Sequence, residues 1–377
     1  MKKIFLSLLV ILMLSACGKT TPVPPTQYPD TPTPNVVNAP VVESPALISI
    51  HMLDEAYGWG VTETQIVRTN DGGVTWYNVT PQGIAEVGYK ADTFFLDVNH
   101  GWVLFPDEFD PMNKGLLYRT SDGGMNWDNA SMPFGRADMT FLDASNAWAL
   151  VDRGVGAGSN AVAVYQSTDG GSNWTMNYTN DPTQPNAGDS LPLGGLKSFL
   201  TPRDMQTAWV GGVVYSEGTV YLYRSDDSGK TWSQLSLSLP AEAQTSQLTF
   251  EQMTFVSPND AFFVMRIPAD TSREAVYVSH DRGETWALTP TLIPQGGSAD
   301  FISAAEAVIF NGEQFYVTKD AAQTWTIIPP DVVFGDSFSG MDFVNSSTGW
   351  VIATDPANHH SLYKTTDGGA TWTPIVP

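Results

Sequence analysis

The sequence predicts an all-β fold, namely a single seven-bladed β-propeller with four antiparallel strands in each blade. Three observations predict it: one tight-turn motif occurs seven times, a second motif precedes each copy, and all twelve tryptophans lie within these two motifs. Repeats of about 40 to 50 residues built from short strands are typical of propellers, because one blade cannot bury its faces without a neighbour. We therefore expect the packing of blade on blade to form the core.

The turn motif occurs first as RTNDGGVTW over residues 68–76, where an aspartate is followed by two glycines and then by a tryptophan. Asp and Gly favour tight turns, since Asp can bind its own backbone and Gly readily adopts positive φ. We expect the motif to join the third and fourth strands of each blade. Ala321 and Ala322 replace the two glycines in the sixth copy, which predicts a looser turn there. The seven aspartates are Asp71, Asp122, Asp169, Asp227, Asp281, Asp320 and Asp367.

The second motif consists of a large apolar residue, several polar residues, a small residue and usually a tryptophan, as in FLDVNHGW over residues 95–102. It indicates that a first strand ends near the apolar residue and a second strand begins at the small residue. Both motifs together assign residues 47–377 to one propeller domain. Because the first and last strands complete whole blades, we expect the ring to close by side-by-side packing.

The N-terminal 16 residues have the form of a secretory signal, with Lys2 and Lys3 before a short apolar run. Residues 14–17, Leu-Ser-Ala-Cys, resemble a bacterial lipobox, which implies cleavage before Cys17 and lipidation of its sulfur. Residues 17–46 are rich in Pro and Thr and predict a solvated tether. We expect an exported protein that Cys17 holds to a membrane, at the cell surface or on the periplasmic side. The alternative is an ordinary signal peptide with an incidental cysteine.

Composition excludes several kinds of function. Removal of Lys2 and Lys3 leaves 18 − 2 = 16 basic residues against 40 acidic ones, a net charge of 16 − 40 = −24. Such a surface repels phosphate backbones, so we expect no nucleic-acid partner. Cys17 is the only cysteine, so its lipidation would leave no disulfide and no thiolate. We expect no metal and no cofactor.

The turn motif resembles the Asp-box, or BNR, repeat S/T-x-D-x-G-x-T-W of sialidases, sortilin-type receptors, xyloglucan-cleaving hydrolases and photosystem II assembly factor-like propellers. The resemblance covers residues 48–376. In that family the aspartate accepts hydrogen bonds from its own turn, which implies a structural role for all seven copies. The photosystem II assembly factor-like group consists of single seven-bladed propellers that bind proteins. The resemblance implies a non-catalytic scaffold with a protein partner in the cell envelope, and we expect a monomer.

The edge of the ring opposite the turns is where we expect binding. Its loops vary in length and sequence, and irregular loops on a rigid scaffold usually carry recognition. An acidic loop there could contact a cation or a basic peptide, or could simply be solvated. Two adjacent histidines lack a third ligand at metal spacing, so we expect no metal site. The candidate residues are Asp107, Glu108, Asp110, Arg153, Arg266, Arg273, His359 and His360.

A cell-surface carbohydrate-binding protein and a sialidase-like glycoside hydrolase are the alternatives. Residues 266–268, Arg-Ile-Pro, resemble the sialidase signature whose arginine binds the sialate carboxylate. This copy follows four Asp boxes, whereas the sialidase signature precedes the first. A glycoside hydrolase also requires a pair of carboxylates flanking the bond, which sequence spacing does not reveal. We therefore predict that the protein is not an enzyme.

Overall fold

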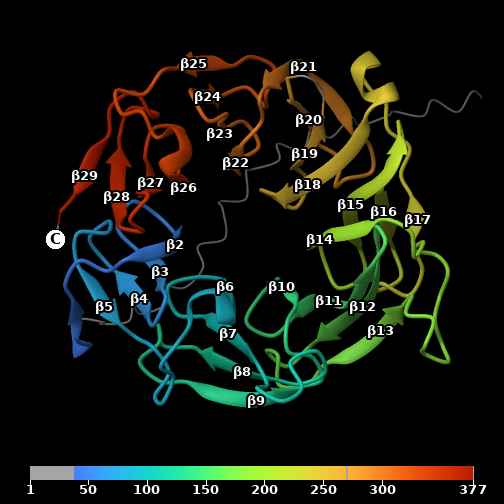
Figure 1. Cartoon of the computed structure of the whole chain (residues 1–377), viewed down its shortest axis with the longest axis horizontal. Coiled ribbons are helices and arrows are strands. Elements are labelled where there is room, and N and C mark those ends of the chain that lie inside the picture. The colour runs from blue at the N-terminus through green and yellow to red at the C-terminus, as the bar shows by residue number, and fades with distance from the viewer. Residues whose placement is uncertain (1–37, 269–270, 377) are drawn as a thin grey trace, which may run out of the picture. The chain divides into compact units, whose positions relative to one another are not determined.

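The computed structural model describes residues 38–268 and 271–376, and nearly all of its regular elements are strands. All of these described residues belong to one compact unit. Within this unit the sheets stand around a central opening, as Figure 1 shows, so the predicted β-propeller is confirmed. The helices of the described residues are single short 3-10 turns, and none could cross a membrane. The predicted signal, Cys17 and most of the predicted tether lie outside the described residues.

The strands follow one another as antiparallel meanders of four, and each meander contains one copy of both motifs. The first three are β2 (Leu47–Met52), β3 (Gly58–Thr62), β4 (Ile66–Thr69), β5 (Trp76–Asn78); β6 (Asp92–Phe95), β7 (Gly101–Pro106), β8 (Gly115–Thr120), β9 (Asp128–Met132); and β10 (Asp138–Phe141), β11 (Ala147–Gly156), β12 (Ser159–Ser167), β13 (Thr175–Thr179). The next two are β14 (Leu196–Pro202), β15 (Ala208–Glu217), β16 (Leu222–Ser225), β17 (Ser233–Gln234); and β18 (Gln247–Phe255), β19 (Ala261–Ile267), β20 (Arg273–Ser279), β21 (Ala287–Pro294). The last two are β22 (Ser298–Phe301), β23 (Ala307–Phe310), β24 (Phe315–Thr318), β25 (Thr326–Ile328); and β26 (Phe338–Phe343), β27 (Gly349–Thr354), β28 (His360–Thr365), β29 (Thr373–Ile375). The 3-10 turns η2 (Gly88–Lys90), η3 (Ala241–Thr245) and η4 (Gly335–Ser337) lie in the links between meanders.

The simplest form of the prediction is seven separate four-stranded sheets. The structure differs, because two of the meanders are joined by hydrogen bonds. Six sheets are present among the described residues, because β15 pairs with β18 and joins two meanders into one eight-stranded sheet. Both strands are long, and their ends meet at Val213–Thr249 and Glu217–Gln247. Extension of β15 past its own partner strand leaves free backbone groups that β18 can pair with.

Two residues of the predicted tether belong to the propeller. Val41 and Val42 form β1, which pairs antiparallel with Tyr77 and Trp76 on the outer edge of the first sheet. Two β-branched residues in succession favour an extended backbone. The contacts of the propeller therefore begin before residue 47.

The first and last meanders meet by packing, and no strand of the described residues is shared between them. The backbone N–H of Met52 in β2 donates to Asp342 Oδ2 in β26 at 2.6 Å. Trp350 Nε1 of β27 donates to the carbonyl of Gly72 at 2.9 Å, and both indole and carbonyl are buried. Side-by-side closure agrees with the sequence-based expectation.

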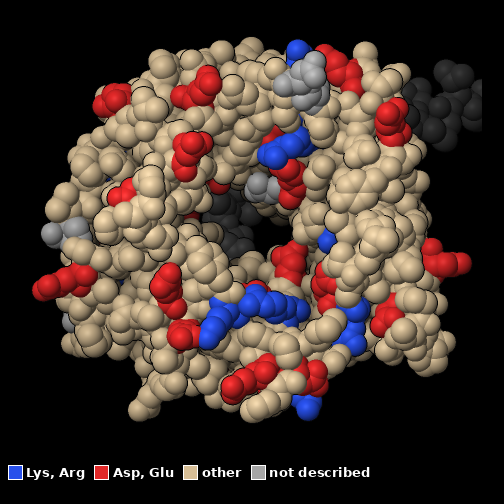
Figure 2. Space-filling view, in the orientation of Figure 1, with Lys and Arg blue, Asp and Glu red and all other residues tan. Residues whose placement is uncertain are grey.

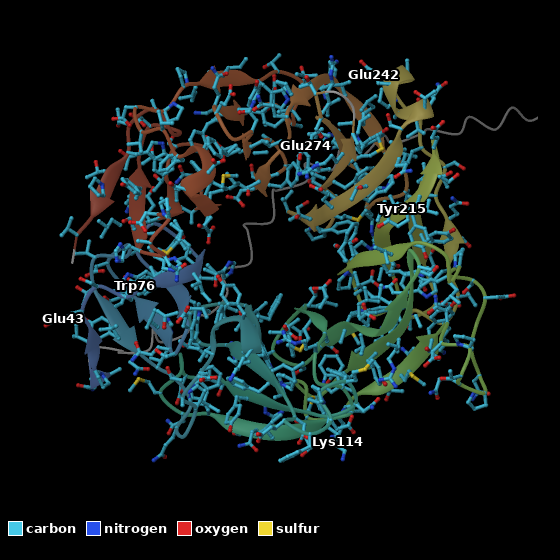
Figure 3. The ribbon with its side chains drawn as sticks, in the orientation of Figure 1. Glu43, Trp76, Lys114, Tyr215, Glu242 and Glu274 are labelled. Atoms are coloured by element: carbon cyan, nitrogen blue, oxygen red, sulfur yellow. The ribbon has the colours of Figure 1, made fainter. Side chains whose placement is uncertain are left out.

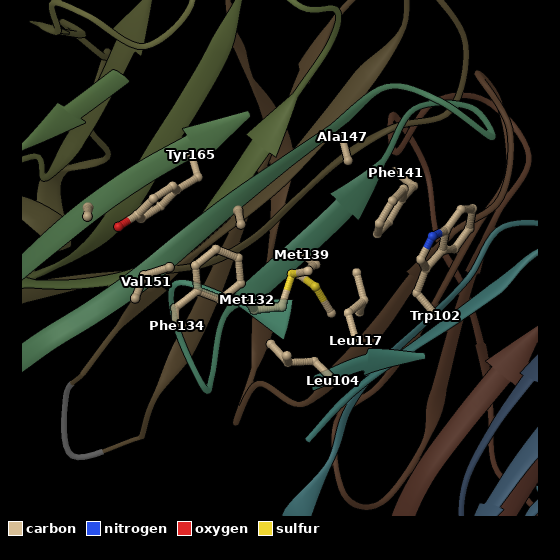
Figure 4. Close-up of a cluster of buried hydrophobic side chains, with 12 residues drawn as sticks. Trp102, Leu104, Leu117, Met132, Phe134, Met139, Phe141, Ala147, Val151 and Tyr165 are labelled. Atoms are coloured by element: carbon tan, nitrogen blue, oxygen red, sulfur yellow. The ribbon is translucent and has the colours of Figure 1, made fainter. Parts of the chain in front are cut away.

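The core consists of apolar side chains held between neighbouring sheets. Figure 4 shows one such cluster, in which Trp102, Leu104 and Leu117 of the second meander meet Phe141 of the third. The Trp102 and Phe141 rings stack with centroids 3.7 Å apart. Complete burial of one such side chain stabilises the fold by roughly 1.5–3 kcal/mol, so blade-on-blade packing is the main source of stability.

The tryptophans of the second motif also bind across blades. Trp59 Nε1 donates to Asp97 O, Trp102 Nε1 to Gly170 O and Trp148 Nε1 to Asp204 O, at 2.9 to 3.1 Å. Each acceptor belongs to the next meander along the chain. The twelve tryptophans are thus packing residues, as the sequence predicted, and not an exposed ligand platform.

Candidate binding site

The Asp-box aspartates are occupied within their own turns. In all seven copies Oδ1 accepts a hydrogen bond from a Thr or Ser hydroxyl two residues earlier and from the backbone N–H four residues later, at 2.8 to 2.9 Å. In Asp227, for example, burial raises the pKa, but hydrogen bonds from Thr231 and Ser225 outweigh burial and hold the pKa below its usual range. The Oδ1 atoms of these carboxylates are therefore structural acceptors within their own turns.

Each Asp box is also fixed to the turn between the first two strands of its own meander. The N–H of the residue after the aspartate donates to a carbonyl of that turn at 2.8 to 2.9 Å in all seven cases, beginning with Gly72 N–H to Ala56 O. The sixth box is no looser than the others, contrary to expectation. Ala321 and Ala322 adopt φ of 56° and 61°, and Thr324 N–H still donates to Asp320 Oδ1 at 2.9 Å. The hydrogen bonds outweigh the strain of two left-handed alanines.

These turns define two faces of the ring. We call the edge that carries the Asp boxes the box face. The opposite edge, which carries the hairpins between second and third strands and the links between meanders, is the loop face. Two large apolar side chains of the box turns are exposed, Val74 and Met125. Exposed large apolar side chains of the loop face include Tyr89, Phe109, Met112, Val155, Leu193 and Tyr215.

The predicted acidic loop of the second meander binds mainly itself. Asp107 Oδ1 accepts hydrogen bonds from the N–H groups of Phe109 and Asp110, and Asp110 Oδ1 accepts from Asn113 Nδ2 at 2.9 Å. Glu108 is exposed. These contacts hold the hairpin in a shape that presents the Phe109 side chain, which is 90% exposed.

The two predicted histidines point to different partners. His359 Nδ1 lies 3.0 Å from Asp355 Oδ2, whereas His360 Nδ1 lies 3.0 Å from the Thr354 hydroxyl. No group of three His, Cys, Asp or Glu side chains within the described ranges is arranged to hold a metal ion. This hairpin therefore offers two separate polar contacts and no common site.

Arg266 is held by two glutamates in the fifth meander. Its Nη2 lies 2.9 Å from Glu251 Oε2 and 3.3 Å from Glu274 Oε1. Glu274 is fully buried, and Gly297 N–H donates to the same Oε1 at 2.9 Å. Burial raises the pKa of Glu274, partly offset by this N–H and by Arg266. An arginine so paired is not poised to bind the carboxylate of a sugar, so the resemblance to the sialidase signature does not extend to this contact.

The remaining two predicted arginines lie apart from each other. Arg273 Nη1 forms a surface ion pair with Glu242 Oε1 at 3.2 Å, in the region labelled in Figure 3. Arg153 is half-buried on the third meander, and its positive charge contributes to a lowered pKa of Asp181. Arg153 directly follows Asp152, which lines the cavity described next.

A cavity of about 350 Å³ opens on the loop face between the second, third and fourth meanders. We call it the mouth cavity, and its polar walls are Asp92, Arg136, Asp138, Asp152, Asn160 and Lys197. Asp92, Asp138 and Lys197 lie at the starts of the innermost strands β6, β10 and β14, which places them beside the central opening. Figure 2 shows acidic side chains with a few Lys and Arg side chains around that opening.

The two acidic residues of the inner strands each hold the next blade. Asp92 Oδ2 accepts from the Ala137 N–H and Asp138 Oδ2 from the Leu200 N–H, both at 3.0 Å. Burial in the channel wall raises the pKa of Asp138, as does the negative charge of Asp92, while the Leu200 N–H opposes them. The Asp138 side chain nevertheless remains exposed to the solvent of the cavity.

Both cations of the cavity are already engaged. Lys197 is 6% exposed, and its Nζ donates to the carbonyls of Asn160, Leu193 and Gly195 at 2.9 to 3.2 Å. Burial lowers the pKa of Lys197 to about 8, against the opposing charge of Asp152. Arg136 Nη1 pairs with Asp92 Oδ1 at 3.1 Å.

Sequence reasoning did not select these wall residues. The sequence did contain a pattern that could have identified two of them, because Asp92 and Asp138 each stand three residues before the Phe that ends an inner strand. Lys197 carried no comparable signal.

A second and larger cavity, of about 680 Å³, involves the turns between first and second strands on the box face. Its walls are mainly apolar and include Phe94, Phe141, Pro202 and Met253. Arg203 on its rim donates hydrogen bonds to Asp204 Oδ2, to the Thr207 hydroxyl and to the carbonyl of Arg282.

The fold and its seven occupied turns define the class: this chain is a β-propeller built from BNR/Asp-box repeats. The model of the BNR/Asp-box repeat family matches residues 277–288, which contain the fifth Asp box. The chain is similar to the photosystem II assembly lipoprotein Ycf48 of Synechococcus sp. (strain CC9902), with 24% identity over 174 residues, 43% of this chain and 48% of that protein. It is also similar to a probable oligoxyloglucan-reducing end-specific xyloglucanase of Neosartorya fischeri, with 29% identity over 220 residues, 48% of this chain and 26% of that protein.

Among solved structures, YCF48 bound to D1 peptide shares the fold, with a TM-score of 0.52 and 15% identity over 87% of this chain and 94% of that one. The matched segments span about half of the curated assembly lipoprotein and about a quarter of the xyloglucanase. These comparisons link the fold both to a protein-binding assembly factor and to carbohydrate-cleaving enzymes.

Proposed function

We propose that this chain is an exported lipoprotein, anchored to a membrane through Cys17, whose seven-bladed propeller binds a protein partner in the cell envelope through its loop face and performs no catalysis. Each four-stranded meander supplies one blade, including the two joined by β15 and β18. The similarity to an assembly lipoprotein supports this role.

The observation that carries the proposal is the asymmetry of the two faces. Apolar side chains as large as Phe109 and Tyr89 are 90% and 78% exposed on loop-face hairpins and links, whereas the box turns expose few. Clustered exposed apolar side chains, and aromatic ones above all, mark protein interfaces. The Asp-box carboxylates, by contrast, accept hydrogen bonds within their own turns.

The test is chemical crosslinking of the full chain in its own cells, followed by purification. We expect one envelope protein to be captured by the wild type and lost with Phe109→Ser. Val74→Ser is the matched control, because Val74 is 53% exposed on a box turn, and it should retain capture. Equal capture by both variants would place binding elsewhere and contradict the proposal.

Anchoring is tested separately. Cys17→Ala should move the protein from the membrane fraction to the soluble fraction, because the acyl chains are the proposed membrane attachment. Unchanged retention of the variant would contradict the lipid anchor and leave the binding face untouched.

Glycoside hydrolysis is the second candidate, supported by the similarity to a xyloglucanase and by Asp92 and Asp138 in one cavity. A hydrolase requires two carboxylates that act on one bond. The assay is release of reducing ends from xyloglucan by the wild type and by Asp138→Asn. Activity that the substitution abolishes would replace the non-catalytic proposal.

A further inference from the structure

We infer that the mouth cavity receives one basic side chain, Lys or Arg, from an extended apolar segment of the partner protein. This inference rests on the proposed function and adds to it the chemistry of the segment that is recognised. It follows from the charges inside the cavity and from the apolar side chains around it.

The cavity contains two carboxylates that form no ion pair within the part of the chain that the structure describes. Asp138 and Asp152 line it, and neither forms an ion pair among the described residues. Asp152 Oδ1 accepts from the Gly154 N–H at 2.7 Å and Oδ2 from Asn160 Nδ2 at 3.3 Å, which fixes its position without cancelling its charge. Two fixed carboxylates in a concave site attract a cation.

The cations of the cavity are not free to pair with these carboxylates. Lys197 Nζ points to three backbone carbonyls, and Arg136 divides its donors between Asp92 and the carbonyl of Tyr89. An acidic ligand would therefore meet two carboxylates that lack an ion-pair partner among the described residues, beside cations that already have partners of their own. The chemistry selects a positively charged group.

Two exposed apolar residues are joined to these walls by hydrogen bonds. The carbonyl of Tyr89 accepts from Arg136 Nη2 at 2.9 Å, and the Tyr89 side chain is 78% exposed. The carbonyl of Leu193 accepts from Lys197 Nζ at 2.9 Å, and the Leu193 side chain is 43% exposed. These two hydrogen bonds thus fix the backbone positions from which apolar side chains meet the solvent.

Two more exposed apolar residues, Val155 and Tyr215, belong to hairpins next to the cavity. Val155 is 66% exposed on the hairpin whose strands carry Asp152 and Asn160. Tyr215, labelled in Figure 3, is 58% exposed, and its ring lies so close to Gly158 that a Cβ there would come within 2.9 Å of it. The neighbouring blade therefore adds an aromatic side chain to the same hairpin.

A charged cavity with an apolar border fits a peptide better than other ligands. A volume of about 350 Å³ stands near the lower end of the roughly 300–1,000 Å³ typical of ligand pockets and is large enough for one long side chain. A segment laid across the apolar border would direct its basic side chain inward. Aromatic and apolar anchors around a desolvated charge are a common pattern in interface hot spots.

The experiment is selection of a random dodecapeptide phage library on the purified full chain. We expect enrichment of peptides in which Lys or Arg is flanked by apolar residues. One such peptide, synthesised with a fluorophore, should bind the wild type by fluorescence anisotropy. Its affinity should fall at least tenfold for the double substitution Asp138→Asn and Asp152→Asn, which preserves shape and removes charge, and for Tyr215→Ser.

The control is Asp128→Asn, because Asp128 is an exposed carboxylate of β9 outside the cavity, and it should change affinity less than twofold. Enrichment of acidic or neutral peptides, no enrichment, or binding unaffected by the double substitution would each overturn the inference. The crosslinking experiment judges the proposed function independently. A partner lost with Phe109→Ser but retained by the double substitution would overturn this inference alone.

Discussion

Replacement of Asp342 by Asn should remove a pH-dependent weakness at the closure of the ring. Asp342 joins the last blade to the first through the Met52 N–H. Its side chain is 17% exposed, and burial raises its pKa to about 7, with the Met52 N–H opposing that shift. His51 Nδ1 lies 4.0 Å away, and burial lowers the pKa of this histidine. Burial raises the pKa of Asp300 in the neighbouring blade, and the charge of Asp342 raises it further.

The pKa of Asp342 makes the stability of the fold depend on pH. A carboxyl whose pKa is higher in the folded than in the unfolded state binds protons more tightly when folded, so the free energy of unfolding falls as pH rises from about 4 to about 7. Between pH 5 and pH 7 a shift to about 7 corresponds to roughly 2 kcal/mol, because the slope of about 1.4 kcal/mol per pH unit declines as the folded group begins to ionise near pH 7. Asn cannot ionise and still offers an oxygen to Met52. The difference between variant and wild type should therefore move in favour of the variant by about 2 kcal/mol.

The assay is thermal unfolding of both proteins from pH 5 to pH 8. With an unfolding entropy of roughly 2 cal/mol/K per residue, about 2 kcal/mol corresponds to a relative Tm shift of about 3 °C for a domain of this size. Asp128→Asn is the control, because Asp128 lies on β9, away from the closure between the last and first blades, and it should not reproduce this shift. A difference for Asp342→Asn that stays constant from pH 5 to pH 8 would refute the reasoning.

Three further substitutions test the joints of the ring by thermal unfolding. Trp350→Phe should lower the free energy of unfolding by about 1–2 kcal/mol more than Trp209→Phe, because both indoles are fully buried but, of the two, only Trp350 Nε1 has a hydrogen-bond partner. Equal losses of stability would contradict the inter-blade hydrogen bond. Ala321→Gly should raise the free energy of unfolding by about 1 kcal/mol, because φ at this residue is 56°, a left-handed conformation that glycine adopts without strain. A lower Tm of the variant would show that the turn is unstrained. Asp367→Ala should cost roughly 1–2 kcal/mol through loss of its bonds to Thr365 and Thr371, and an unchanged Tm would exclude a structural role for the box.

The repeated motifs made the fold predictable because they encode contacts within a blade. A Thr or Ser two residues before the aspartate and an N–H four residues after it suffice to form the turn, and both positions are visible in the sequence. The small residue and Trp of the second motif likewise predict the start of the second strand, as at Gly101 and Trp102 of β7. Local chemistry repeated at a regular period needs no knowledge of the neighbouring blades.

The mouth cavity was not predictable for the opposite reason. Asp92, Asp138 and Lys197 come from three blades, and their positions become related only when the inner strands stand side by side. The pairing of β15 with β18 escaped prediction in the same way, because it depends on how far two long strands extend beyond their own meanders. Motif spacing carries no information about either.

Residues that repeat and residues that do not therefore have different roles in this ring. Arg68, Arg224 and Lys364 all stand three residues before a box aspartate, lie over a tryptophan of the second motif and donate to a carbonyl of the next blade around the ring. The recurrence of that contact, even where the last blade meets the first, marks it as architecture. Asp152, Leu193 and Tyr215 take no part in that recurring contact. They belong to one sector of the loop face, where Asp152 lines the mouth cavity, the Leu193 carbonyl binds Lys197 and the Tyr215 ring lies beside Gly158. A ring needs its joints at every blade and a binding site at only one sector, so departure from the repeat is the feature that locates the site.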